Sequence, residues 1–131
     1  MDPLLKRRDS EDWDMSETYN LYRQGQEHLA AGLNAQATVA LEKAKRREPE
    51  KASIREALGI AYFRIRRFAE AEREFRVILD LKPVDHYAHF ALARCLEKQG
   101  RRDEAFGHYK MASFFRPQSE AYKQALEALE R

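Results

Sequence analysis

The sequence predicts an all-helical domain built from a short structural repeat, and three observations carry this prediction. The chain of 131 residues contains only five glycines and four prolines, a composition that favours helices over a turn-rich β fold. Three of the prolines, Pro49, Pro83 and Pro117, are spaced by 34 residues. Small and large apolar residues keep the same period, which is typical of stacked repeats that each contain two helices.

Each repeat is expected to pair two helices, with a small residue on each where the partner helix approaches closely and a large residue filling the next gap. The first helices carry a small residue in register, at Gly25, Gly59 and Ala93. The second helices carry an alanine followed four residues later by a large residue, in the pairs Ala37–Leu41, Ala71–Phe75 and Ala105–Tyr109. Neither helix buries its apolar face alone, so the repeats must stack.

Turn residues separate the predicted helices. Gly32 and Gly100 are expected to turn the chain between the two helices of repeats one and three, whereas Arg66 stands at this place in repeat two. Each of the three spaced prolines is expected to stop a second helix.

Polar residues at the predicted helix starts are expected to act as N-caps. Asn34 and Asp103 would cap two of the second helices, Asp85 would cap the first helix of repeat three, and Ser119 would cap a last helix.

The domain organisation follows from these boundaries. Three repeats are predicted at residues 18–51, 52–85 and 86–118, with a C-terminal capping helix at 119–131. Residues 1–17 carry three basic and six acidic residues, and such a segment is expected to form a flexible acidic tail.

The repeat resembles the tetratricopeptide repeat, whose pattern is roughly W-x2-L-G-x2-Y, then A-x3-F, then P. The resemblance covers about residues 18–117. It is strongest in repeat two, at Leu58, Gly59, Tyr62, Ala71, Phe75 and Pro83. In repeat one, Gln24 and His28 replace larger apolar residues. The resemblance implies a right-handed α-solenoid of three helix-turn-helix repeats.

The same resemblance implies a binding groove, because in this family the first helix of every repeat lines a concave face. The corresponding residues, which are not used for packing between paired helices, are Tyr19, Tyr22, Arg23, Gln26, Ile60, Phe63, Arg64, Tyr87, Phe90 and Arg94. This set is aromatic with interleaved arginines, and it suits a peptide with large apolar anchors and one or two acidic groups. Alternatively, some of these aromatic residues pack against neighbouring helices.

Some members of the family hold the C-terminal carboxylate of heat-shock chaperones with lysine, asparagine and arginine side chains. The matching positions here are Tyr22, Gln26, Ala57, Tyr87 and Ala91. None of them is basic, so the sequence disfavours a co-chaperone of that kind.

The sequence contains no recognisable catalytic constellation, so we expect no enzyme activity and no cofactor. His86 and His89 lie beside Asp85, but no further Cys or His completes a metal site. Cys95 is predicted to be a buried, inert thiol.

Nucleic acid is an unlikely partner, because the net charge is only +2 and no RNA-binding signature is present. The arginines at 64–67 and 101–102 are interpreted as a solvated, partly salt-bridged edge. No segment resembles a secretion signal or a membrane span. One cysteine cannot form an internal disulfide, which favours the cytoplasm.

The leading functional interpretation is an adaptor or chaperone-like module that docks a partner protein segment in the groove. The alternative is a structural subunit that self-associates or sits permanently in a larger complex. The segment 9–17 contains Trp13 among five acidic residues, so it is also a possible ligand of the groove of its own chain or of a neighbour.

Overall fold

The computed structural model describes the backbone of residues 3–130 and the side chains of residues 16–130. All regular structure in this range is helical. The seven helices are α1 (Pro3–Ala30), α2 (Asn34–Arg47), α3 (Ala52–Arg64), α4 (Phe68–Leu81), α5 (His86–Lys98), α6 (Arg102–Phe115) and α7 (Glu120–Glu130). The prediction of an all-α repeat fold is therefore confirmed.

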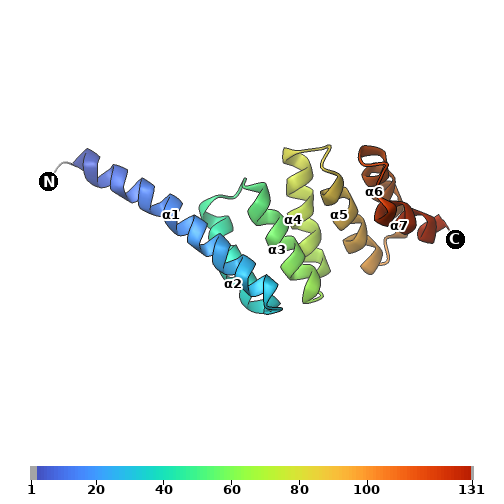
Figure 1. Ribbon diagram of the computed structural model, residues 1–131, viewed down its shortest axis with the longest axis horizontal. Coiled ribbons are helices and arrows are strands. Elements are labelled where there is room, and N and C mark those ends of the chain that lie inside the picture. The colour runs from blue at the N-terminus through green and yellow to red at the C-terminus, as the bar shows by residue number, and fades with distance from the viewer. Residues whose placement is uncertain (1–2, 131) are drawn as a thin grey trace.

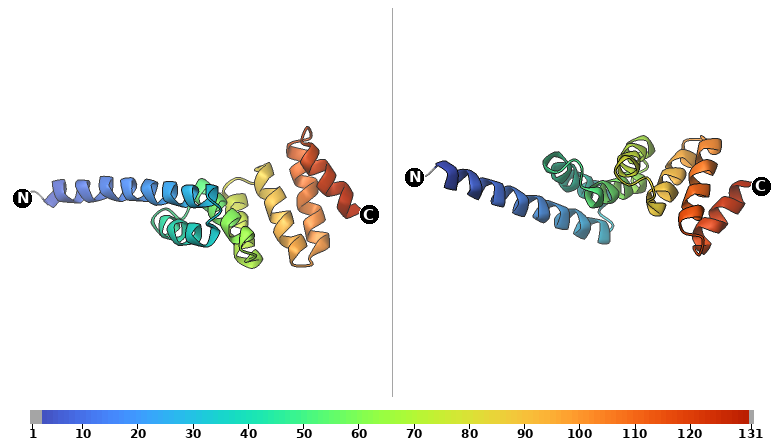
Figure 2. Two further views of the ribbon diagram at one scale, coloured as in Figure 1. Left: turned by 60° about the horizontal axis from the view of Figure 1, so that its bottom comes forward. Right: turned by 90° about the horizontal axis from the view of Figure 1, so that it is seen from above.

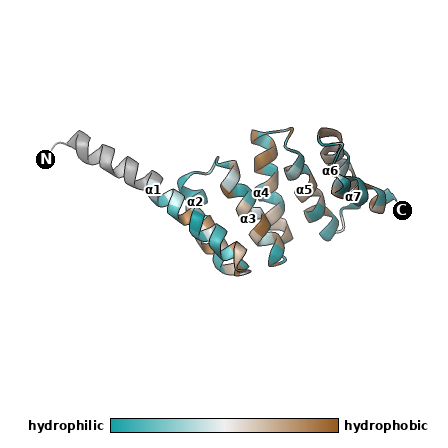
Figure 3. Ribbon diagram, in the orientation of Figure 1, coloured by the Kyte–Doolittle hydropathy of each residue, from teal (hydrophilic) through white to brown (hydrophobic). Residues whose placement is uncertain are grey.

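The helices form three antiparallel pairs, α1/α2, α3/α4 and α5/α6, which stack in chain order (Figure 1). Helix α7 packs against α6 at the end of the row, and Figure 2 shows the same succession from two other sides. Hydrophilic and hydrophobic residues alternate along α2 to α7 (Figure 3), as expected for helices that bury only one face.

Close contact within each pair depends on the predicted small residues. A Cβ atom placed on Gly59 would lie 2.7 Å from the ring of Phe75, and one on Gly25 would lie 2.5 Å from Leu41. Both large residues are almost completely buried. The predicted close approach of the paired helices at a small residue is confirmed for these two repeats.

A left-handed residue forms the turn within each pair. Gly32 and Gly100 have φ angles of 77° and 79°, and Arg66 adopts φ 66° at the equivalent place. The N–H of the following residue donates to a carbonyl five residues earlier, in the bonds Leu33 to His28, Arg67 to Tyr62 and Arg101 to Leu96. This is the Schellman arrangement, in which a residue without a Cβ has the least strain.

Two of the four predicted N-caps are confirmed. Asp85 accepts a hydrogen bond from the N–H of Ala88 at 3.0 Å, and Ser119 Oγ accepts one from the N–H of Tyr122 at 3.3 Å.

The predicted caps at Asn34 and Asp103 are wrong. The second helices begin directly after the left-handed residue, so the N-cap positions fall on Leu33 and Arg101. Asn34 instead accepts a hydrogen bond from Arg64.

The N-terminal boundary also differs from the expected one. Helix α1 begins at Pro3, not near residue 18, and its first half extends away from the other helices (Figure 1). Proline is tolerated in the first turn of a helix, and no further proline or glycine interrupts the chain before Gly25. The flexibility expected of residues 1–17 stays a prediction.

Buried acidic residues on α4 join neighbouring repeats. Glu74, whose side chain is 5% exposed, pairs with Lys45 of α2 at 3.1 Å and with Arg55 of α3 at 2.9 Å. Glu72 pairs with Arg101, at the start of α6, at 2.8 Å. These ion pairs fix the stacking that positions the first helices relative to one another.

Candidate partner-binding groove

Three adjoining hollows run along the face formed by α1, α3 and α5. The first is lined by Tyr19, Tyr22, Glu48, Lys51, Ser53 and Ile54. The second is lined by Tyr22, Gln26, Leu29, Ser53, Glu56, Ala57 and Ile60. The third is lined by Ile60, Phe63, Arg64, Phe75, Tyr87, Phe90, Ala91 and Arg94. Because neighbouring hollows share residues, they form one continuous surface, here called the groove.

The size of the third hollow favours a side chain as its occupant. Its volume is about 220 Å³, whereas sites for drug-sized molecules have roughly 300–1,000 Å³. A chain of such hollows is suited to an extended or helical peptide that inserts one side chain into each.

The predicted groove residues are brought together with one exception. All of them line the hollows except Arg23, which forms an exposed ion pair with Glu27 along the surface of α1 at 3.3 Å. Sequence reasoning missed Glu48 and Lys51, which reach the first hollow from the connection between α2 and α3. Pro49 could have indicated these residues in the sequence, because it marks the end of α2 and hence the connection to α3.

The aromatic residues of the groove have packing contacts as well. Phe63 lies edge-on to Phe68 with ring centroids 5.1 Å apart, and Phe90 stacks on Tyr122 of α7 at 4.8 Å. Tyr19, in contrast, is 60% exposed. Each packed ring is half-buried, so one part stabilises the stack while another part lines the groove. The packing of these rings is therefore confirmed, and their role in binding a peptide stays a prediction.

The two arginines of the third hollow make different contacts within the protein. Arg64 donates to the carbonyl of Leu29 at 3.1 Å and to Oδ1 of Asn34 at 3.3 Å, so it ties α3 to the turn between α1 and α2. Arg94 lies over the rings of Phe63 and Phe90, at 5.4 and 5.9 Å from their centroids. Among residues 16–130, no carboxylate forms an ion pair with Arg94.

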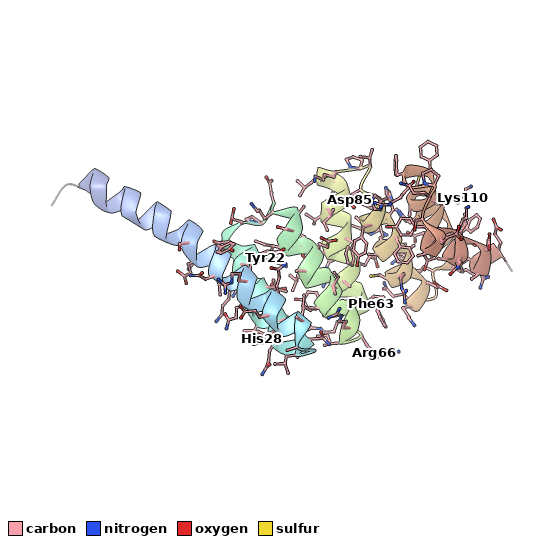
Figure 4. All side chains as sticks on the ribbon, viewed as in Figure 1. Tyr22, His28, Phe63, Arg66, Asp85 and Lys110 are labelled. Carbon is pink, nitrogen blue, oxygen red and sulfur yellow. The ribbon has the colours of Figure 1, made fainter. Side chains whose placement is uncertain are left out.

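Acidic residues lie toward the opposite end of α3 and α5. Burial and the nearby carboxylate of Asp85 raise the pKa of Glu56. Burial, followed by the charge of Glu56, raises the pKa of Tyr87. Figure 4 places Asp85 and Arg66 at opposite ends of the helices. Along the helix axes, Glu56 and Asp85 thus lie toward the N-terminal ends of α3 and α5, whereas Arg64 and Arg94 lie toward their C-terminal ends.

The candidate residues for other chemistry have separate structural roles. His86 Nδ1 lies 2.7 Å from the hydroxyl of Tyr122, whereas His89 Nδ1 lies 3.0 Å from His108 Nδ1. In the described part of the chain, no cluster of three or more His, Cys, Asp or Glu residues is suited to a metal ion. Cys95 is completely buried, and this burial raises the pKa of its thiol to about 12, which keeps it protonated and unreactive.

Most arginines of the two basic clusters are engaged within the protein. Arg67 pairs with Glu70 and lies over the ring of Tyr62. Arg101 pairs with Glu72 and with a carboxylate of its own helix, Glu104. These contacts agree with the interpretation of a partly salt-bridged edge. In the described range, no helix is both long and apolar enough to cross a bilayer.

The possible self-ligand Trp13 has a side chain outside the described residues. Residues 9–17 would have to be extended to reach the groove of their own chain. In the structure this segment belongs to α1, which leads away from α3 and α5 (Figure 1). A contact within one chain through an extended segment therefore has no support from the fold, and a contact with a neighbouring chain stays a prediction.

Comparison with known proteins agrees with the repeat pattern. The tetratricopeptide-repeat model matches residues 22–86 and 66–120. The tetratricopeptide repeat and J domain-containing co-chaperone DNJ1 of Fusarium oxysporum f. sp. lycopersici is 33% identical over 93 residues, which are 71% of this chain and 18% of the relative. The chain thus spans about a fifth of that relative's length.

Solved structures of low sequence identity share the fold. One is the second tetratricopeptide domain of human RPAP3 in complex with the HSP70 peptide SGPTIEEVD, which superposes with a TM-score of 0.84 at 14% identity. The match covers 90% of this chain and 98% of the RPAP3 chain. The type III secretion chaperone SycD of Yersinia enterocolitica, in complex with a peptide of the translocator YopD, has a TM-score of 0.76 at 16% identity and covers 86% and 91%. The chain belongs to the tetratricopeptide-repeat family.

Proposed function

We propose that this chain is a protein-interaction adaptor or chaperone-like module, without catalytic activity or cofactor, that holds a partner segment in the groove. The observation that carries the proposal is the continuous run of hollows along α1, α3 and α5, with half-buried aromatic rings and with Arg94, which forms no ion pair within residues 16–130. The peptide complexes of human RPAP3 and of SycD support this use of the fold. The buried thiol of Cys95 fits the cytoplasmic location that we propose.

The proposed partner segment carries large apolar anchors and acidic groups. The side chains at the five carboxylate-clamp positions do not favour a chaperone C-terminus, because none of them is cationic. Gln26 donates to the hydroxyl of Tyr22 at 2.8 Å, and Ala57 and Ala91 contribute only methyl groups. The ligand is therefore expected to depend on hydrophobic contacts in the hollows more than on a terminal carboxylate.

Selection of peptides from a phage-displayed random library against the full chain tests this function. Selected peptides are expected to lose at least about tenfold in affinity for Tyr22→Ala and for Arg94→Glu. Arg73→Glu is the matched control, because Arg73 is exposed on α4 on the side opposite to buried Ala71 and Phe75. Peptides that bind all three variants as well as the original chain would contradict the proposal.

Self-association is a second candidate, which one feature of α6 favours. Phe114 and Met111 are 75% and 40% exposed, and Gly107 on the same side of the helix has open space around it. Such an apolar face with a small residue allows close approach of another helix. Sedimentation velocity over a concentration series should then reveal a dimer that Phe114→Ser abolishes. A monomer at all concentrations would rule this candidate out.

A further inference from the structure

A row of contacting side chains connects the turn between α3 and α4 with α7. Its members are two arginines and four aromatic rings. The successive separations are Arg66 to Phe68 5.4 Å, Phe68 to Phe63 5.1 Å, Phe63 to Arg94 5.4 Å, Arg94 to Phe90 5.9 Å and Phe90 to Tyr122 4.8 Å. Phe63, Arg94 and Phe90 line the third hollow of the groove.

The two arginines of this row lack an anionic partner in the described part of the chain. Their neighbours differ in this respect, since Arg67, Arg76 and Arg101 all form ion pairs with glutamates. Arg66 and Arg94 are exposed, and their guanidinium carbons lie 5.4 to 5.9 Å from the centroids of aromatic rings. A guanidinium that lies over an aromatic ring can still donate from the N–H groups at its edge to a carboxylate or a phosphate.

The backbone conformation of Arg66 independently indicates a functional role for this residue. Its φ of 66° lies in the left-handed region, where the equivalent residues of the other two repeats are Gly32 and Gly100. A Cβ atom is unfavourable in this conformation, and the fold accepts glycine at the same turn. The strain is therefore not required for folding, and backbone strain that the fold does not require is often associated with a functional site.

We propose that Arg94, which lines the groove, and Arg66, which lies on the other side of the Phe63–Phe68 pair, form an extended anion subsite that binds acidic side chains of the peptide segment held in the groove. The anionic group is a carboxylate of Asp or Glu or the phosphate of a phosphorylated Ser or Thr. This inference rests on the proposed peptide-binding function. The carboxylates of Glu56 and Asp85 near the other end of α3 and α5 repel an acidic residue there, so the subsite also fixes the direction of the peptide.

An array of synthetic peptides tests the subsite with the full chain as the soluble probe. Every peptide has an apolar frame of Leu and Phe, and one position is occupied in turn by Glu, phosphoserine, Gln or Ser. The variants are Arg94→Gln and Arg66→Gly, the second of which carries the residue of the equivalent turns and is expected to fold. Arg73→Gln on α4 is the control that removes one exposed charge elsewhere.

The original chain should prefer Glu or phosphoserine over Gln and Ser by at least about tenfold, as expected for a charge-assisted hydrogen bond. Both test variants should lose most of this preference while they still retain the Gln peptides, and Arg73→Gln should keep it. A stronger signal for phosphoserine than for Glu would identify the phosphate as the anion.

Retention of Glu and Gln peptides with equal strength by the original chain would overturn the anion subsite but leave the peptide-binding function intact. If no apolar frame were retained, the proposed function itself would fail, and the subsite with it.

Discussion

At the scale of single residues, two glycines in helices have opposite roles. Gly59 lies against the ring of Phe75, which is 1% exposed, whereas a Cβ atom on Gly107 would meet nothing within 4 Å. The repeat period predicted the first role, because Gly59 is in register with Gly25. Gly107 has no counterpart at this spacing, so its role depends on the surroundings of α6.

Alanine substitutions at these two glycines should therefore have effects of opposite sign. Gly59→Ala should destabilise the fold by about 1–2 kcal/mol through overpacking against Phe75. Gly107→Ala should stabilise it by about 0.5–1 kcal/mol, because glycine is unfavourable inside a helix. Urea unfolding followed by circular dichroism measures both free energies. Equal effects of the two substitutions would mean that the packing face of α3 is misplaced.

A pair of histidines, buried His89 and half-buried His108, should make the stability of the fold depend on pH. Burial, followed by the charge of His89, lowers the pKa of His108 below its ordinary value of 6.5; Arg76 contributes in the same direction, whereas Glu104 and Glu72 oppose it. The folded state thus binds a proton less readily than the unfolded chain. The stability is fully present above about pH 6.5 and is lost as the pH falls below that value.

Urea midpoints at pH 7.5 and 5.5 check this dependence. The midpoint of the original chain should fall between the two conditions, and His108→Gln should reduce the fall. His28→Gln, in the first repeat, is the control and should leave it unchanged. The same fall in all three proteins would assign the pH dependence to other groups.

At the scale of elements, α4 connects its neighbours through buried charges. Glu74→Ala should leave Arg55, whose side chain is only 15% exposed, without its carboxylate partner, and should leave Lys45 with Glu42 alone. The expected loss is about 3 kcal/mol. Glu70→Ala on the same helix removes an ion pair with Arg67, which is 55% exposed, and should change stability by less than about 1 kcal/mol. Thermal unfolding of both variants compares them, and similar melting temperatures would refute the joining role of Glu74.

The helices were predictable from the sequence where a repeated spacing defines them, and less so at their ends. The period identified the three pairs and α7 because packing requires the same small and large residues in each copy. The start of α1 was missed, since acidic composition was interpreted as a tail although no helix-breaking residue follows Pro3 until Gly25. The caps at Asn34 and Asp103 were missed because the left-handed turn residue decides where the next helix begins.

At the scale of the whole molecule, the repeat pattern of packing residues is broken at the two ends of the stack, on α1 and on α7. Leu58 and Leu92 are completely buried, whereas Gln24, at the equivalent place in repeat one, is exposed, because no repeat packs on that side in the described structure. Glu127 of α7 is exposed at the place where Gly59 meets its partner helix. Solvated residues thus replace packing residues at both ends of the stack.

The lining of the hollows was largely predictable, because the resemblance to the tetratricopeptide repeat assigns it to the first helices, but the contacts of each side chain were not. The sequence placed Arg23, Arg64 and Arg94 in one class. The structure distinguishes them, since Arg23 pairs along α1, Arg64 binds the preceding turn, and Arg94 stacks on two rings. Such differences depend on contacts between residues far apart in the chain, which spacing alone does not define.

The central claim is that the partner segment binds along α1, α3 and α5, and amide chemical-shift mapping by NMR tests it most directly. The labelled full chain is titrated with the tightest peptide from the phage selection. The largest shifts are expected at Tyr22, Ile60, Phe63, Ala91 and Arg94, while the exposed residues of α2, α4 and α6 stay unchanged. Shifts centred on Met111 and Phe114 of α6, with the groove residues unaffected, would contradict the claim.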